Sequence, residues 1–109
     1  MIIGTGELET DLYRLKESNP QGYGYLKKYW DDAKRGLDGT DKNYARVTHI
    51  YENIPEPRIG TRGLGQTLVL LAQLNVISVL TNRSNATIYD LTTYRPDRLK
   101  QIGQHLNEK

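Results

Sequence analysis

Apolar residues recur along the first third of the chain at intervals of three and four, which predicts helices. Three leucines favour a helix over residues 7–18, and the Asn19-Pro20 pair ends it. A broad stripe of aromatic and aliphatic side chains predicts a second helix over residues 22–35. Gly36, followed by a short turn, is its expected stop.

The middle of the chain predicts two more helices joined by a proline-rich connection. Thr40 is placed to cap a third helix over residues 41–53, and the Pro-Glu-Pro segment at 55–57 ends it. A fourth helix is expected to begin near Thr61, which is a good N-cap residue. Leucines recur on one face of this helix, at Leu64, Leu68, Leu71 and Leu74.

Beyond the fourth helix the pattern changes to β-branched and aromatic residues. Asn75 ends the helix, because asparagine tolerates the left-handed conformation that commonly closes one. Residues 76–81 and 87–93 predict two strands joined by a polar turn at 82–85, which together make a β-hairpin. A last helix is expected over residues 95–107. Its apolar stripe consists of Leu99, Ile102 and Leu106.

Two glycines interrupt the first turns of the fourth predicted helix. Gly63 and Gly65 each cost about 1 kcal/mol of helix stability relative to alanine. Such a cost indicates that something approaches the helix closely there. Both a neighbouring helix and the backbone of a bound molecule such as DNA fit this interpretation.

A chain of 109 residues is expected to form one domain with a single modest core. It contains no cysteine, which excludes disulfides and thiolate metal sites. The N-terminal residues do not read as a signal peptide, and no apolar run approaches the roughly 18 residues of a membrane span. We therefore expect a soluble cytoplasmic protein.

Charge is distributed unevenly, although the net charge is only +2. Residues 1–36 are neutral overall, residues 37–57 carry −2 and residues 58–109 carry +4. From Arg58 to Tyr89 the sequence holds three arginines and no acidic residue. This positive region coincides with the fourth helix and the hairpin, as expected if one face of the protein meets phosphate groups.

No combination of residues predicts catalysis, and we expect neither a metal nor a cofactor. His49 and His105 have no second histidine at metal-binding spacing, so we interpret both as structural or surface residues. The aspartates near predicted helix ends and turns are interpreted as solvated or capping groups, namely Asp31, Asp32, Asp38 and Asp41.

Aromatic side chains gather in the second predicted helix, at Tyr23, Tyr25, Tyr29 and Trp30. Either they form a dimer interface or they pack this helix onto its own domain. We favour packing, because tyrosine and tryptophan combine a large apolar ring with a polar group that suits half-buried positions.

Two helices followed by a β-hairpin, over residues 40–93, resemble a winged helix-turn-helix DNA-binding domain. Leu74-Asn75-Val76-Ile77 is similar to the end of the recognition helix in regulators of the MarR and ArsR kind, with asparagine at a glycine position. Tyr89-Asp90-Leu91-Thr92 is similar to their second wing strand. The C-terminal winged helix of archaeal replication initiators looks similar in the same places. The connection at 54–60 is longer than the usual turn of about three or four residues.

The resemblance implies one domain at residues 1–109, mainly helical with a small β-hairpin. Its winged-helix core would span residues 40–93, between an N-terminal helical extension at 1–37 and a C-terminal helix at 95–107. Both a dimer arm and a part of the core remain possible for residues 1–37.

The resemblance also implies that the fourth helix enters the major groove of DNA. Arg62, Gln66 and Thr67 would then face the bases, because arginine pairs with guanine and glutamine with adenine through two hydrogen bonds. Arg58 and Thr61 would contact phosphates beside the helix N-terminus. The hairpin tip would reach the adjacent minor groove or its phosphates through Asn82, Arg83, Ser84 and Asn85.

These expectations lead to a sequence-specific protein that binds double-stranded DNA as a homodimer, in the first place a transcriptional regulator acting as a repressor. A plasmid or viral replication or partition accessory factor is a close second. The rival is a winged helix used as a protein-interaction module. One contiguous positive face around Arg58, Arg62 and Arg83 favours DNA, whereas a flat tyrosine-rich apolar patch elsewhere favours a protein partner.

Overall fold

The computed structural model describes residues 7–83 and 86–107, without the side chains of residues 82, 83 and 86. Within these ranges the protein is mainly helical and carries a small three-stranded antiparallel sheet. The helices are α1 (Leu8–Ser18), α2 (Pro20–Gly39), α3 (Val47–Glu52), α4 (Thr61–Gln73) and α5 (Pro96–Asn107). The strands are β1 (Tyr44–Ala45), β2 (Ser78–Arg83) and β3 (Ala86–Asp90), and the 3-10 turn η1 (Leu91–Thr93) follows β3.

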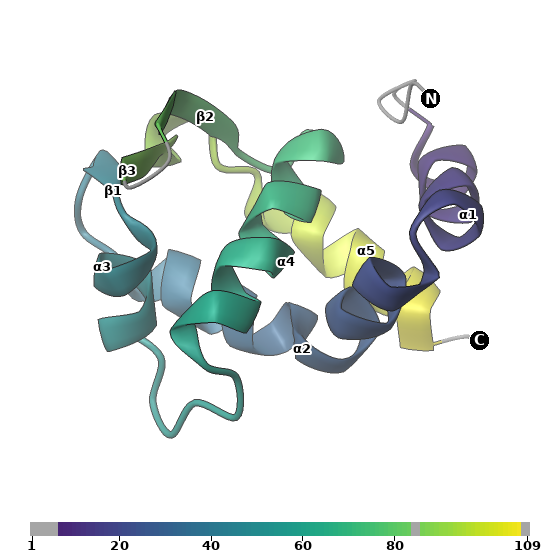
Figure 1. The fold of residues 1–109 in the computed structure, drawn as a ribbon, viewed down its shortest axis with the longest axis horizontal. Helices are drawn as coiled ribbons and strands as arrows, with labels where there is room; N and C mark the ends of the chain where they lie inside the picture. The colour runs from purple at the N-terminus through teal and green to yellow at the C-terminus, as the bar shows by residue number, and fades with distance from the viewer. Residues whose placement is uncertain (1–6, 84–85, 108–109) are drawn as a thin grey trace.

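The long helix α2 is the element around which the others are arranged. It packs against α1, α3, α4 and α5, and α4 crosses in front of it, with the sheet at one end of the molecule and α1 at the other (Figure 1). Leu26, Ala33 and Leu37 of α2 belong to the buried core. The described part of residues 1–37 is therefore built into the core, which answers the alternative that the sequence left open.

The predicted apolar stripes of the long helices are confirmed. Leu12 and Leu15 of α1 are buried, and the four leucines that recur along α4 and its C-cap are fully buried. The three apolar residues of α5 are fully buried as well. None of the described helices combines the length and apolar composition needed to span a membrane.

The predicted β-hairpin is confirmed, and the structure adds a third strand that the sequence did not predict. The strand order is β1-β3-β2, and both pairings are antiparallel. Tyr89 of β3 lies between Ala45 and Val79 in register. The pairing of β2 with β3 is irregular between Val79 and Thr81. Because β3 ends at Asp90, the strand predicted over 87–93 gives way to η1 at its last three residues.

The third predicted helix, over residues 41–53, is wrong in its first half. Only Val47–Glu52 are helical, as α3, because Tyr44 and Ala45 pair with β3 instead. Ala45 is buried by this distant pairing, which outweighs the local preference for helix. Thr40 consequently does not cap α3. It follows the end of α2, where its hydroxyl donates to the carbonyl of Gly36 at 2.7 Å.

The predicted stop of α2 at Gly36 is also wrong, since the helix continues to Gly39. A Cβ at Gly36 would lie 2.8 Å from the Ile50 side chain and 2.9 Å from the Ile50 carbonyl oxygen. The missing side chain therefore lets α3 approach α2 closely and does not end the helix. At the other end, Asn19 Oδ1 accepts a hydrogen bond from Gly22 N at 3.0 Å and caps α2.

Helix α4 begins and ends as the sequence predicts, apart from its cap. Gly60 is the N-cap and makes no side-chain capping hydrogen bond, so Thr61 is the first helical residue and not the predicted cap. Asn75 has a φ of +64°, as expected of a residue that closes a helix in the left-handed conformation. Val76 N then donates to Leu71 O at 2.9 Å and directs the chain toward β2.

The contact between α2 and α5 supplies a test of the packing. Gly103 of α5 lies directly against the Trp30 indole of α2, so that a Cβ at this position would overlap the ring. We expect Gly103→Ala to lower the free energy of unfolding by about 2 kcal/mol, because the ring or the helix must move. Urea unfolding followed by circular dichroism measures this loss.

Gly24→Ala is the matched control within α2. A Cβ at Gly24 meets nothing within 4 Å, so this change should raise the free energy of unfolding by about 1 kcal/mol through helix propensity alone. Equal effects of the two substitutions would contradict the close contact between Gly103 and Trp30.

Candidate nucleic-acid interface

One side of α4 faces away from the core and carries polar side chains. Arg62, Gln66, Val69 and Gln73 are exposed and stand at intervals of four, three and four, so they form one stripe along the helix, which we call the outward stripe. Thr61 is exposed at the start of the helix. The surface exposure expected of Thr61, Arg62 and Gln66 is therefore present, and their contact with DNA stays a prediction.

Thr67 does not belong to this surface. It is fully buried, and its hydroxyl donates to the carbonyl of Gly63 at 3.0 Å. One residue beyond Gln66 is a rotation of about 100° around a helix, which turns Thr67 toward the buried side. The prediction that its side chain faces a DNA groove is wrong.

The glycines of α4 pack against neighbouring elements. A Cβ at Gly63 would lie 3.0 Å from Ile59 and 3.2 Å from Tyr25 of α2. At Gly65 it would lie 3.6 Å from Val47 of α3, which is an ordinary contact. Close approach by Ile59 of the connection and by Tyr25 of α2 therefore accounts for Gly63, whereas alanine would fit at Gly65.

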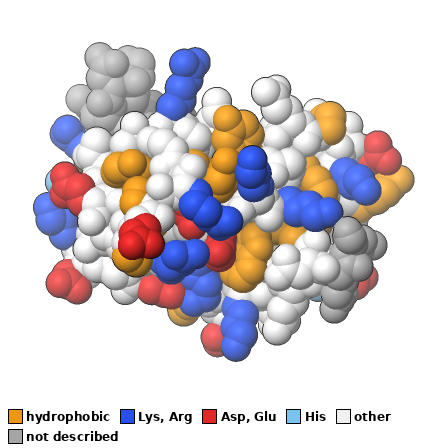
Figure 2. Space-filling model, turned by 90° about the horizontal axis from the view of Figure 1, so that it is seen from below, with side chains coloured by type: hydrophobic (Ala, Val, Ile, Leu, Met, Phe, Trp, Pro, Cys, Tyr) orange, Lys and Arg blue, Asp and Glu red, His pale blue; other side chains and the backbone are white. Residues whose placement is uncertain are grey.

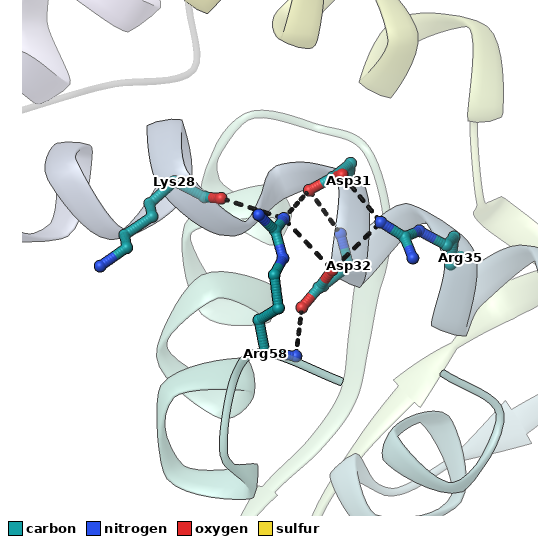
Figure 3. A network of polar contacts seen from close by, with 5 residues as sticks. All are labelled: Lys28, Asp31, Asp32, Arg35 and Arg58. Carbon is teal, nitrogen blue, oxygen red and sulfur yellow. Dashed lines mark hydrogen bonds and ion pairs between the residues drawn. The ribbon is translucent and has the colours of Figure 1, made fainter. Parts of the chain in front are cut away.

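Arg58 is tied to α2 through two adjacent carboxylates (Figure 3). Its Nη2 lies 2.7 Å from Asp31 Oδ1 and 3.4 Å from Asp32 Oδ1. Its backbone N–H donates to Asp32 Oδ2 at 2.9 Å. A DNA phosphate would have to compete with these carboxylates for the guanidinium. The structure gives Arg58 a positioning role, and its contact with a phosphate stays a prediction.

Asp32 is the residue of this region whose role the sequence analysis predicted wrongly. It is fully buried, although we interpreted it as a solvated or capping carboxylate. Arg35 Nη2 approaches it at 3.4 Å from the next turn of α2 and also pairs with Asp31 at 2.9 Å. Asp32 therefore holds the segment before α4 against α2.

The far end of α4 is held by a second charged group. Arg98 of α5 donates through Nε to the carbonyl oxygen of Leu74, the C-cap of α4, at 2.6 Å. Its Nη2 lies 3.8 Å from the buried carboxylate of Asp11 on α1. This arrangement satisfies one of the carbonyls that a helix end leaves unpaired and links α4 to both terminal helices.

A tyrosine ties the end of α2 to the segment that follows the sheet. The Tyr94 hydroxyl donates to Asp38 Oδ1 at 2.6 Å. Burial raises the pKa of Tyr94, and the hydrogen bond to Asp38 raises it further. The phenol therefore stays neutral and keeps donating throughout the physiological range of pH.

The face beside the connection to α4 carries charges of both signs. Figure 2 shows Lys and Arg side chains across the middle of this face, with Asp and Glu side chains among them. The exposed tyrosines do not form one patch, because Tyr13 belongs to α1 and Tyr44 to β1, at opposite ends of the molecule (Figure 1). On the face shown in Figure 2 the cations are therefore interspersed with carboxylates. The side chain of Arg83 lies outside the described residues, so the contiguous positive face around the three arginines stays a prediction.

The predicted contacts of the hairpin tip fall outside the described part of the structure. For Asn82 and Arg83 the backbone belongs to β2, but their side chains are not described. Ser84 and Asn85 lie outside the described residues altogether. The four contacts stay predictions.

The aromatic cluster of α2 packs within its own domain, as we favoured. Tyr23, Tyr29 and Trp30 are partly buried against the core. The rings of Tyr25 and Tyr29 lie 5.8 Å apart between centroids. These contacts account for the aromatic side chains without a second copy of the chain.

The histidines make local contacts in this structure. His49 Nδ1 accepts from Arg46 N at 3.4 Å at the start of α3, and His105 Nδ1 lies 3.8 Å from Glu9. Within residues 7–83 and 86–107, no group of three or more His, Cys, Asp or Glu side chains is arranged to hold a metal ion.

Comparison of the chain with protein-family models, with curated proteins and with solved structures finds no match in any of the three. The functional assignment therefore depends on the side chains of this protein and on how the fold arranges them.

The buried carboxylate before α4 supplies a second prediction. We expect Asp32→Asn to lower the free energy of unfolding by about 2 kcal/mol, because the buried carboxylate accepts from Arg58 N and pairs with two half-exposed guanidinium groups, and a neutral amide weakens these charge-assisted hydrogen bonds. The control is Asp31→Asn, which removes a half-exposed partner of the same arginines and should cost about 0.5 kcal/mol. Urea unfolding measures the free energy of unfolding of both variants. Similar losses of free energy would show that Asp32 does not hold the segment before α4 against α2.

Proposed function

We propose that the chain is a winged-helix protein that binds double-stranded DNA through α4 and the β2–β3 hairpin, as a transcriptional regulator that acts as a homodimer. The order of two helices and a hairpin, α3-α4-β2-β3, supports this assignment. In addition, β1 pairs with β3 and fixes the hairpin to the helical part of the domain.

The observation that carries the proposal is the chemistry of the outward stripe. Its arginine and two glutamines can each donate hydrogen bonds to base edges or phosphates. The sequence between residues 57 and 89 contains no aspartate or glutamate, so neither α4 nor β2 would repel a phosphate backbone. A helix that exposes donors and lacks carboxylates suits a polyanion.

The way in which α4 is held also supports this function. Asp32 and Arg58 fix the segment before the helix, and Arg98 holds its C-terminal carbonyl. The outward stripe therefore stands on a rigid element whose position is set before any partner binds. Such preorganisation lowers the entropy that binding would otherwise cost.

The proposal includes a homodimer. Two copies related by a two-fold axis would present two α4 helices to successive major grooves, about one turn of DNA apart. The target would then be palindromic.

The alternatives are a winged-helix protein-interaction module and a plasmid or viral replication or partition accessory factor. Exposed apolar side chains on the sheet favour the interaction module, because Tyr44 and Leu80 are each 52% exposed. The accessory factor would use the same DNA-binding surface as a regulator, so the same variants test it.

DNA binding is tested by fluorescence anisotropy with a labelled duplex of mixed sequence, at low and at moderate salt. We expect micromolar or tighter binding that weakens steeply with salt, because much of the affinity would come from phosphate contacts. Arg62→Ala should weaken binding about tenfold. Lys100→Ala, which removes an exposed cation from α5, should leave the affinity almost unchanged.

If the protein does not bind the duplex at low salt, DNA binding is contradicted and the protein-interaction module becomes the favoured function. Equal losses of DNA affinity in Arg62→Ala and Lys100→Ala would show that α4 is not the contact surface, because the losses would then reflect the change in net charge alone.

A further inference from the structure

The later turns of α4 carry a pattern that DNA binding in general does not explain. Gln66, Val69 and Gln73 follow one another along the outward stripe. Val69 is 44% exposed, although a β-branched side chain is neither a strong helix former nor favourably solvated there. A helix that contacted phosphates alone would carry cations at these positions, and this one carries two amides and an aliphatic group.

The surface beside these residues is uncharged as well. A shallow depression of about 350 Å³ lies between the outward stripe and the start of α2. Its polar side chains are amides and one phenol, contributed by Asn19, Gln21, Tyr25, Gln66 and Gln73. Among the described residues that line it, none is charged. Uncharged hydrogen-bonding groups suit base edges and sugars better than a phosphate.

The chemistry of the three side chains points to particular base pairs. A glutamine amide offers a donor and an acceptor, which match N7 and the N6 amino group of adenine. A valine offers only methyl groups, which match the C5-methyl of thymine. Arg62, one turn earlier, is the side chain suited to guanine.

The spacing along the helix agrees with consecutive base pairs. From Gln66 to Gln73 the helix rises about 10 Å. That length corresponds to about three base-pair steps of duplex DNA. Val69 stands between the two glutamines, and Arg62 lies about two steps before the first of them.

We propose that α4 reads a short A·T run, with Gln66 and Gln73 each hydrogen-bonded to an adenine and Val69 against a thymine methyl between them. Arg62 contacts a G·C pair that flanks the run. The inference rests on the proposed DNA-binding function and adds the class of target sequence.

Selection from a random-sequence duplex library gives the preferred duplex, and anisotropy then measures its binding. Replacing thymine by deoxyuridine removes only the C5-methyl, and it should weaken binding by the wild type about fourfold. In Val69→Ala the same replacement should have almost no effect. This variant exchanges an exposed valine for a better helix former, so it should fold as the wild type does.

Two further variants sharpen the test. Lys100→Ala changes an exposed side chain of α5, outside the proposed DNA-binding elements, and should keep the fourfold response to deoxyuridine. Gln73→Ala should reduce the preference for A·T over G·C at one position of the site about tenfold.

The outcomes separate this inference from the function on which it rests. Duplex binding with a G·C-rich preferred sequence, with no preferred sequence, or without any response to deoxyuridine would overturn the A·T assignment and leave DNA binding intact. A protein that binds no duplex at low salt would overturn both.

Discussion

The placement of α4 depends on the contacts between the buried carboxylate of Asp32 and Arg58. A carboxylate removed from water costs several kcal/mol unless charged or hydrogen-bonding partners compensate it. Here the backbone N–H of Arg58 and the guanidinium groups of Arg58 and Arg35 supply the compensation. Because the N–H and one of these guanidinium groups belong to Arg58, at one defined position of the connecting segment, alternative paths for residues 53–60 would leave the buried carboxylate with Arg35 alone. The start of α4 is thereby fixed relative to α2.

The two sides of α4 consequently serve different purposes. The inward leucines are fully buried and contribute to the core that α2 organises. The outward stripe takes no part in that core, so its side chains can change without loss of packing. Thr67 marks the boundary, since its hydroxyl bonds back to Gly63 within the helix. The proposed reading surface thus stands on a helix whose stability is set by the opposite side.

Sequence patterns predicted those parts of the fold that local interactions determine. The long apolar stripes and the end of α4 at Asn75 follow from helical periodicity and from one residue's backbone preference. The strand β1 was missed because its pairing with β3 joins segments far apart in the chain. Gly36 was interpreted as the end of the helix because, in the sequence alone, a glycine required for close packing cannot be distinguished from a glycine that ends a helix. Asp32 was predicted to be solvated or capping because its partner Arg58 lies 26 residues away in the chain and could not be identified from spacing.

The single tryptophan of the chain lies where α2 meets α5, with its indole against Gly103. The outward stripe of α4 contains no aromatic side chain. Intrinsic fluorescence excited at the indole therefore reports the environment between α2 and α5 and not the surface of α4. A shift of the emission when a molecule is added means that the surroundings of the indole between α2 and α5 have changed. A constant emission during binding means that recognition leaves the interior of the domain undisturbed.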